Sequence, residues 1–256
     1  MIASFLNRIP QMLLLLPSAL IALSVHESAH GYVAYKLGDP TARNLGRITL
    51  NPAKHFNLLG FISLLFFRIG WANPVPINTR HFKNPRRDMA ISSAAGPISN
   101  LLLALISSIL LRLVAIPIES IIIQESYYAT SYDSLFEILA SNSGFTILSL
   151  LATVLYFSVT LNLNLMIFNL IPIPPFDGSR MAYVLLPPRI YFGVMKYEKY
   201  IMIGFIVLFY LGIITLPLSI ISGAIEDFFY NVLGMPTNYL YYSINHLLSR
   251  LPTFTL

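Results

Sequence analysis

Long apolar runs separated by shorter polar segments are the dominant pattern along this chain. The runs that we predict to span a membrane cover residues 10–37, 89–116, 145–171 and 200–221. Each is long enough, at about 1.5 Å per helical residue, to cross roughly 30 Å of hydrocarbon. We therefore expect a mainly α-helical, polytopic membrane protein with about four spanning helices.

Two segments depart from this pattern. Residues 39–88 carry short β-branched stretches and many Pro and Asn residues, which indicate short strands and turns. Within them the apolar stretch 58–70 is too short for a span, and we expect a re-entrant or strand-like element that dips into the bilayer. Residues 222–256 mix aromatic residues with few charges, which predicts a C-terminal tail of interfacial helices.

Composition supports the membrane interpretation. The 256 residues are 56% hydrophobic and 11% charged, and the mean hydropathy of +0.70 argues against a soluble enzyme. There is no cysteine, so a metal would have to be bound by His, Asp or Glu. The net charge of +5 comes from residues that flank apolar runs, so we attribute it to membrane orientation and expect no nucleic-acid partner. We treat the first run as retained and residues 1–256 as one membrane-embedded domain.

Lys and Arg residues are distributed unevenly among the polar segments. They gather after the first and the third predicted spans, whereas the loop at 118–144 has four acidic residues and neither Lys nor Arg. The positive-inside rule therefore predicts a multi-pass protein of the cell membrane with residues 38–88 and 172–199 in the cytosol. Both the N-terminus and the C-terminal tail would lie outside.

The stretch V-H-E-S-A-H-G at residues 25–31 continues directly out of the first apolar run. His26 and His30 are four residues apart and share one face of a helix, so their neutral imidazoles can bind one Zn²⁺. Glu27 lies beside them and can take a proton from a water on the metal. The pattern is typical of a metallohydrolase, with its chemistry about 10 to 16 Å below one membrane face.

A catalytic zinc site usually takes three protein ligands. Asp177 is our candidate for the third, because it follows the helix break made by Pro172, Pro174 and Pro175 at the cytosolic end of the third span. A turn residue or a partner for Arg180 is the alternative interpretation of this carboxylate.

Four ordered motifs in the chain resemble the site-2 proteases, which are intramembrane zinc metalloproteases. They are H-E-S-A-H (26–30), N-P-A-K-H (51–55), G-P-I-S-N (96–100) and N-L-I-P-I-P-P-F-D-G (169–178). The resemblance implies zinc ligands His26, His30 and Asp177, with Glu27 as general base and acid. It also implies β-hairpins at residues 45–79. The chain is similar to the compact prokaryotic type, which lacks a PDZ or CBS domain.

Three further residues in these motifs are candidates for substrate binding. Asn169 can donate from its amide to a substrate carbonyl or a developing oxyanion, and the resemblance implies the same role. His55 could bind substrate or carry protons, with a solvated loop histidine as the alternative. The Asn100 amide is also a candidate, although bridging between helices is the commoner fate of such groups.

We therefore expect an endopeptidase that cleaves transmembrane segments of membrane-anchored proteins. A helical substrate would have to unwind locally, and pairing with a strand from residues 45–79 would hold it extended. Two alternatives remain, a metal-ion transporter and a non-catalytic protein that binds transmembrane helices. The sequence leaves the oligomeric state open.

Overall fold

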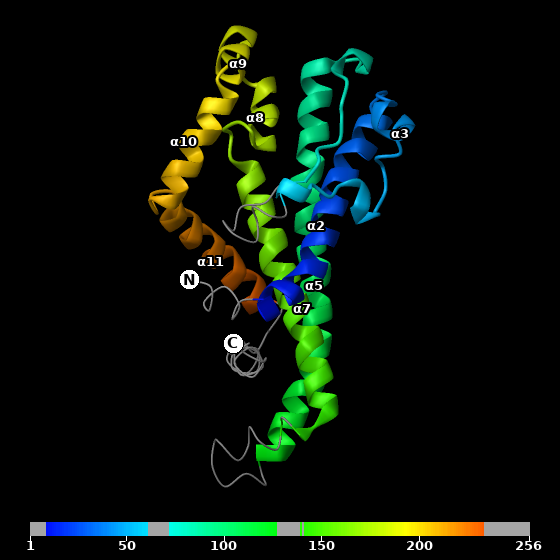
Figure 1. Cartoon of the computed structure of the whole chain (residues 1–256), viewed down its shortest axis with the longest axis vertical. Helices are drawn as coiled ribbons and strands as arrows, with labels where there is room; N and C mark the ends of the chain where they lie inside the picture. Colours follow the sequence, from blue (N-terminus) through cyan, green and yellow to red (C-terminus); the bar gives the residue numbers. More distant parts are fainter. Residues whose placement is uncertain (1–8, 61–71, 127–138, 140, 233–256) are drawn as a thin grey trace. The chain divides into compact units, whose positions relative to one another are not determined.

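The computed structural model describes residues 9–60, 72–126, 139 and 141–232, which are mainly helical and contain no strand (Figure 1). Three of the described helices are long and apolar enough to cross a membrane: α2 (Ile9–Lys36), α5 (Pro85–Ser126) and α7 (Ser143–Leu170). This confirms a mainly α-helical membrane protein. The chain divides into two compact units, one of residues 20–103 and 161–225 and the other of residues 1–19, 104–160 and 226–256.

Helix α5 extends past the bounds predicted from the sequence, whereas α2 matches its predicted bounds to within one residue. At the end of α2, Gly38 adopts a positive φ of 110°, a conformation that glycine reaches without strain. Helix α5 begins at Pro85 and continues through Pro97 and Pro117 for 42 residues, about 63 Å. The predicted end at residue 116 was therefore too early. Proline is tolerated inside membrane helices. An unpaired backbone group in hydrocarbon costs several kcal/mol, so the helix resumes directly after the proline instead of ending there.

Between α2 and α5, the described residues form a helix and two 3₁₀ turns: α3 (Thr41–Asn44), η1 (Pro52–Lys54) and η2 (Thr79–His81). The predicted hairpins at 45–79 are not found in this described part. Prolines remove ladder donors, and side chains take the place of strand partners: Asn51 and Asn78 each accept a backbone N–H at the start of a 3₁₀ turn. The predicted re-entrant element lies mostly at 61–71, outside the described residues.

After α7 the chain turns at residues 171–176 and forms a series of shorter helices. These are α8 (Asp177–Met181), η3 (Ala182–Val184), α9 (Pro188–Met195), α10 (Glu198–Tyr210) and α11 (Thr215–Val232). The predicted fourth span at 200–221 is thus two helices, and a count of four spans is not confirmed. Gly212 has a φ of 79°, outside the helical region. Pro217 has no backbone N–H, so it could not donate the hydrogen bond that a continuous helix would need there. Most of the predicted tail, 233–256, lies outside the described residues.

The core of the unit formed by residues 20–103 and 161–225 includes a cluster of Met166, Ile167 and Leu218. The other unit has its own interhelical contacts. Ser18 of α2 donates to the carbonyl of Val154 in α7 at 2.9 Å, and the hydroxyls of Ser107 and Ser158 lie 2.8 Å apart. Such hydrogen bonds from hydroxyl groups hold apolar helices together in a membrane, where hydrophobic contact alone gives little preference for association between helices.

Candidate metal centre

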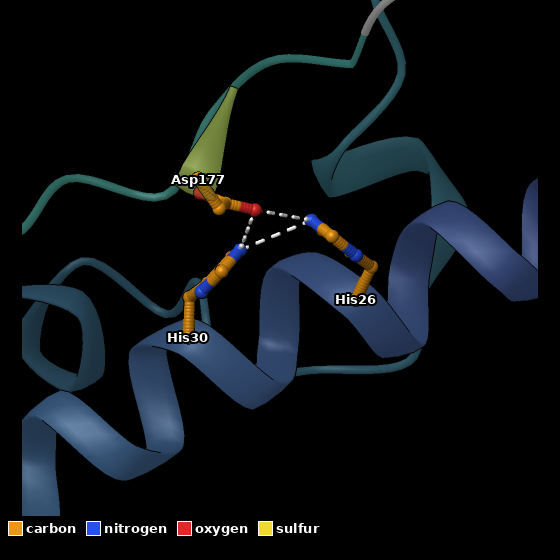
Figure 2. Close-up of side chains that lie close together, drawn as sticks. All are labelled: His26, His30 and Asp177. Carbon is orange, nitrogen blue, oxygen red and sulfur yellow. Dashed lines mark hydrogen bonds and ion pairs between the residues drawn. The ribbon is translucent and has the colours of Figure 1, made fainter. Parts of the chain in front are cut away.

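His26 and His30 lie one turn apart on the same face of α2, and both are more than nine-tenths buried. Asp177, the first residue of α8, directs its carboxylate at both rings (Figure 2). The Asp177 Oδ2 atom is 3.1 Å from each imidazole Nε2, and the two Nε2 atoms are 3.0 Å apart. The structure thus brings together the three ligands predicted from the sequence, and they are the one such group in the part of the chain that it describes.

The second nitrogen of each imidazole decides what the first can do. His26 Nδ1 lies 2.5 Å from the side-chain oxygen of Asn100, and His30 Nδ1 lies 2.8 Å from the backbone carbonyl of Ser92. An oxygen acceptor at Nδ1 requires the proton there, so in the neutral ring Nε2 carries a lone pair. Two lone pairs and a carboxylate oxygen then converge on one point, and a cation between them removes their repulsion.

The spacing of these three atoms fits zinc. Ligand distances of about 2.0–2.1 Å in tetrahedral geometry place neighbouring ligand atoms about 3.3 Å apart. The observed 3.0–3.1 Å is close to that value. The donor set of two imidazoles and one carboxylate is one that catalytic zinc sites use, with a fourth position left for water or substrate. His26, His30 and Asp177 would hold the ion.

Helix α5 approaches the two imidazoles through a face of residues spaced by four: Ser92, Gly96 and Asn100. A Cβ at Gly96 would lie 2.4 Å from Nε2 of His30 and 2.5 Å from Cε1 of His26. Only glycine permits this approach. Gly96 therefore allows α5 to cover the metal centre while its neighbours one turn away accept the Nδ1 protons.

Asp177 is positioned by contacts on both sides of it. Phe176 packs edge-on against Phe205 of α10, with ring centroids 4.9 Å apart. Gly178 lies so close to the end of α7 that a Cβ there would be 2.5 Å from the carbonyl oxygens of Leu170 and Ile171. These contacts hold Asp177 just after α7, within 3.1 Å of both imidazoles.

Arg86, at the start of α5, holds the far end of the same segment. Its Nη2 atom donates to the backbone carbonyls of Tyr183, Val184 and Leu186 at 3.1, 3.4 and 2.5 Å, and its guanidinium lies over the Tyr183 ring. A cation is favourable at carbonyls that end a helical turn. Arg86 thereby ties η3, which directly follows α8, to the helix that also carries Gly96.

Glu27 is half-buried, and its carboxylate contacts the segment 72–78, which forms neither helix nor strand. The backbone N–H of Val75 donates to Glu27 Oε2 at 2.8 Å. Gly31 lies under the same segment, because a Cβ there would be 3.1 Å from Val75 Cγ1. The predicted general base therefore has one oxygen held by a backbone amide.

The other predicted site residues are placed differently. His55 is 2% exposed rather than solvated, and its Nε2 lies 2.9 Å from the carbonyl of Thr49 and 3.5 Å from the Ser28 hydroxyl. Asn169 is half-buried in the last turn of α7 and donates to the carbonyl of Leu165 in its own helix. These contacts leave substrate binding by His55, Asn169 and Asn100 as a prediction.

Comparison with known proteins identifies the family. The model of peptidase family M50 matches residues 15–212, which contain all the residues of the metal centre. The chain belongs to peptidase family M50. This family includes the site-2 proteases, so the resemblance seen in the four motifs is confirmed.

Similar proteins agree with this assignment. The "Putative zinc metalloprotease YwhC" of Bacillus subtilis is 40% identical over 191 residues, which cover 74% of this chain and 77% of the relative. The "Putative zinc metalloprotease Rip2" of Mycobacterium tuberculosis strain H37Rv is 24% identical over 196 residues, 74% of this chain and 64% of the relative. No solved structure matches. This member of family M50 is a zinc metalloprotease.

Proposed function

We propose that this M50 peptidase hydrolyses peptide bonds within the membrane, in the transmembrane segments of membrane-anchored proteins. The observation that carries the proposal is the position of His26 and His30 within the long apolar helix α2. His30 and His26 lie 6 and 10 residues before the end of α2 at Lys36, about 9 and 15 Å along the helix. Because α2 is apolar enough to span, its ligands lie below the headgroups, on the side that we predict to be cytosolic.

The chain's own residues supply the proton transfers and the positioning. When bound, zinc would lower the pKa of a water molecule and polarise the scissile carbonyl. Glu27 takes the proton from the attacking water and returns it to the leaving amine. The Val75 N–H holds Oε2 of this carboxylate, so Oε1 is the oxygen that exchanges the proton. Asn169, in the last turn of α7, is our candidate donor to the developing oxyanion.

A substrate helix must unwind before its carbonyls can react, because they are hydrogen-bonded within the helix. The segment 72–78 contacts Glu27 through the Val75 N–H, and in this proposal an unwound substrate segment aligns along its backbone. His55 supports this region by joining residues 49–55 to Ser28 of α2, and its contribution to substrate binding is indirect in this proposal. The partners are a transmembrane substrate and the lipid bilayer, with no nucleic acid.

Glu27→Gln tests the proposal in purified protein reconstituted with a single-span substrate labelled at both ends. The amide cannot accept a proton, so we expect cleavage to fall by at least about 10²-fold while zinc content stays at one ion per chain. Glu198→Gln, at the start of α10, removes an acid outside the metal centre and should cleave normally. Cleavage by Glu27→Gln at the wild-type rate would refute the mechanism, and cuts confined to residues outside the bilayer would refute an intramembrane site.

A further inference from the structure

Two buried side-chain amides extend the hydrogen bonding of His26 away from the metal centre. Asn100 of α5 and Asn162 of α7 are both fully buried. The Asn100 oxygen lies 2.5 Å from His26 Nδ1, and its Nδ2 donates to the Asn162 oxygen at 2.7 Å. A chain of hydrogen bonds therefore runs from the His26 imidazole through Asn100 of α5 to Asn162 of α7. The reaction described above does not use Asn162.

The orientation of the Asn100 amide decides which tautomer His26 adopts. An asparagine amide presents an acceptor on one side and a donor on the other, and turning it over exchanges them. With its oxygen toward His26, the ring carries its proton on Nδ1 and presents the Nε2 lone pair to the metal. Turned over, Asn100 would donate to Nδ1, the proton would move to Nε2, and His26 could no longer bind a cation.

Two acceptors on the far side fix this orientation. The side-chain oxygen of Asn162 and the backbone carbonyl of Ala22, 3.5 Å from Asn100 Nδ2, both face the nitrogen of the Asn100 amide. The Ala22 carbonyl can only accept, so it requires the donor end of the amide on this side. The Ala22 carbonyl cannot turn over and so sets the direction, whereas the short contact with the Asn162 oxygen supplies most of the strength that holds Asn100 in it.

We propose that Asn162 is a positioning residue that acts through Asn100 to hold His26 in its metal-binding tautomer. This role rests on the proposed zinc-dependent function of the same site. His30 needs no such device, because its Nδ1 faces the Ser92 backbone carbonyl, which cannot turn over. The proposal also assigns Asn100 to His26 rather than to the substrate. Partners that orient metal-binding histidines typically change metal affinity by about 10- to 100-fold.

Zinc affinity of the purified full-length chain tests this inference without any measurement of cleavage. Asn162→Leu removes the acceptor, and we expect zinc affinity, measured by competition with a chromophoric chelator, to fall at least about tenfold. The visible absorption of the Co²⁺-loaded variant should change intensity, because one ligand is misoriented. Asn162→Asp keeps an oxygen facing Asn100 and should retain wild-type affinity. Should Asn162→Leu fail to fold, Asn162→Ser, which is too short to reach Asn100, replaces it.

Asn164→Leu is a matched control on the same helix. Its oxygen accepts from the Ser222 hydroxyl at 2.8 Å, so this variant also loses a part-buried interhelical amide contact, but one that does not lead to His26. We expect it to lower thermal stability while zinc affinity stays unchanged. Equal affinities of Asn162→Leu and Asn164→Leu would overturn the proposal.

Asn100→Asp separates positioning from general packing. Both carboxylate oxygens accept, so turning the group over no longer matters and His26 keeps its proton on Nδ1. In this background Asn162→Leu should have no further effect on zinc affinity, whereas a tenfold loss there would contradict the proposed route through Asn100. Failure of the wild-type chain to bind zinc would instead refute the proposed function itself.

Discussion

The close approach of Gly96 to both imidazoles makes Gly96→Ala a stringent test of the metal centre. The new Cβ would lie 2.4 Å from His30 Nε2, whereas ordinary contacts begin at 3.4 Å. Either the ring or α5 must therefore move by about 1 Å. Ligand positions in a metal site are tolerated within about 0.2 Å, so this displacement is several times too large.

We expect Gly96→Ala to lose zinc affinity and activity by at least about 10²-fold, because a 1 Å misplacement near reacting groups has effects of that size. Overpacking should also lower the free energy of unfolding by about 1–3 kcal/mol. The measurements are zinc content after dialysis against a weak chelator, thermal unfolding of the apoprotein, and cleavage of the reconstituted substrate.

Gly204→Ala in α10 provides the matched control, since none of the described atoms lies within 4 Å of the Cβ it would add. This substitution should keep zinc binding and raise stability by about 0.5–1 kcal/mol, the usual gain for alanine over glycine inside a helix. If Gly96→Ala bound zinc as tightly as Gly204→Ala, α5 could not be in contact with the two imidazoles as described.

Three further substitutions have defined outcomes. Gly178→Ala should lower zinc affinity more than it lowers helix content, measured by competition and circular dichroism, because its Cβ would meet rigid backbone and displace Asp177. Arg86→Met should weaken zinc binding by up to about fivefold and speed hydrogen exchange at residues 177–187, since it removes three carbonyl contacts at an exposed site. Asp39 is fully buried, and although burial raises its pKa, hydrogen bonds from Thr41, from the Asn78 N–H and from His81 outweigh it and lower the pKa. The ionised Asp39 therefore stabilises the fold above a pH of about 4, and this stabilisation is lost as the pH falls through the lower folded-state pKa. Asp39→Asn should lower the free energy of unfolding by about 1–3 kcal/mol at neutral pH and by less in acid, as thermal unfolding at several pH values would show.

The three residues that converge in the candidate metal centre could be picked out from the sequence because each carries its own local signal. Two histidines four residues apart share a helix face whatever surrounds them, and an acid after a proline-induced break must lie near the end of its helix. The helices were likewise evident from apolar length. Their ends were less predictable, because Pro117 stops a helix in water but not among apolar neighbours.

The residues that support the ligands could not be identified in the same way. Gly96 belongs to the G-P-I-S-N motif, but only the fold shows that it faces two imidazoles. Asn162 is an amide in apolar sequence, and its partner on another helix is a tertiary fact. The β-hairpins at 45–79, which the resemblance implied, are not found in the described part of that range, where side-chain contacts cap two 3₁₀ turns.

The hydrogen bond from the Val75 amide to Glu27 makes the position of the proposed general base depend on loop length rather than on loop composition. Every residue other than proline offers the same N–H, so exchanging Val75 for another side chain leaves the donor in place, and scanning mutagenesis will pass over it. Inserting or deleting one residue among 72–78 shifts a different amide, or the nitrogen of a neighbouring proline, into that position. Enzymes built in this way tolerate diversity in the segment while remaining intolerant of any change in its register.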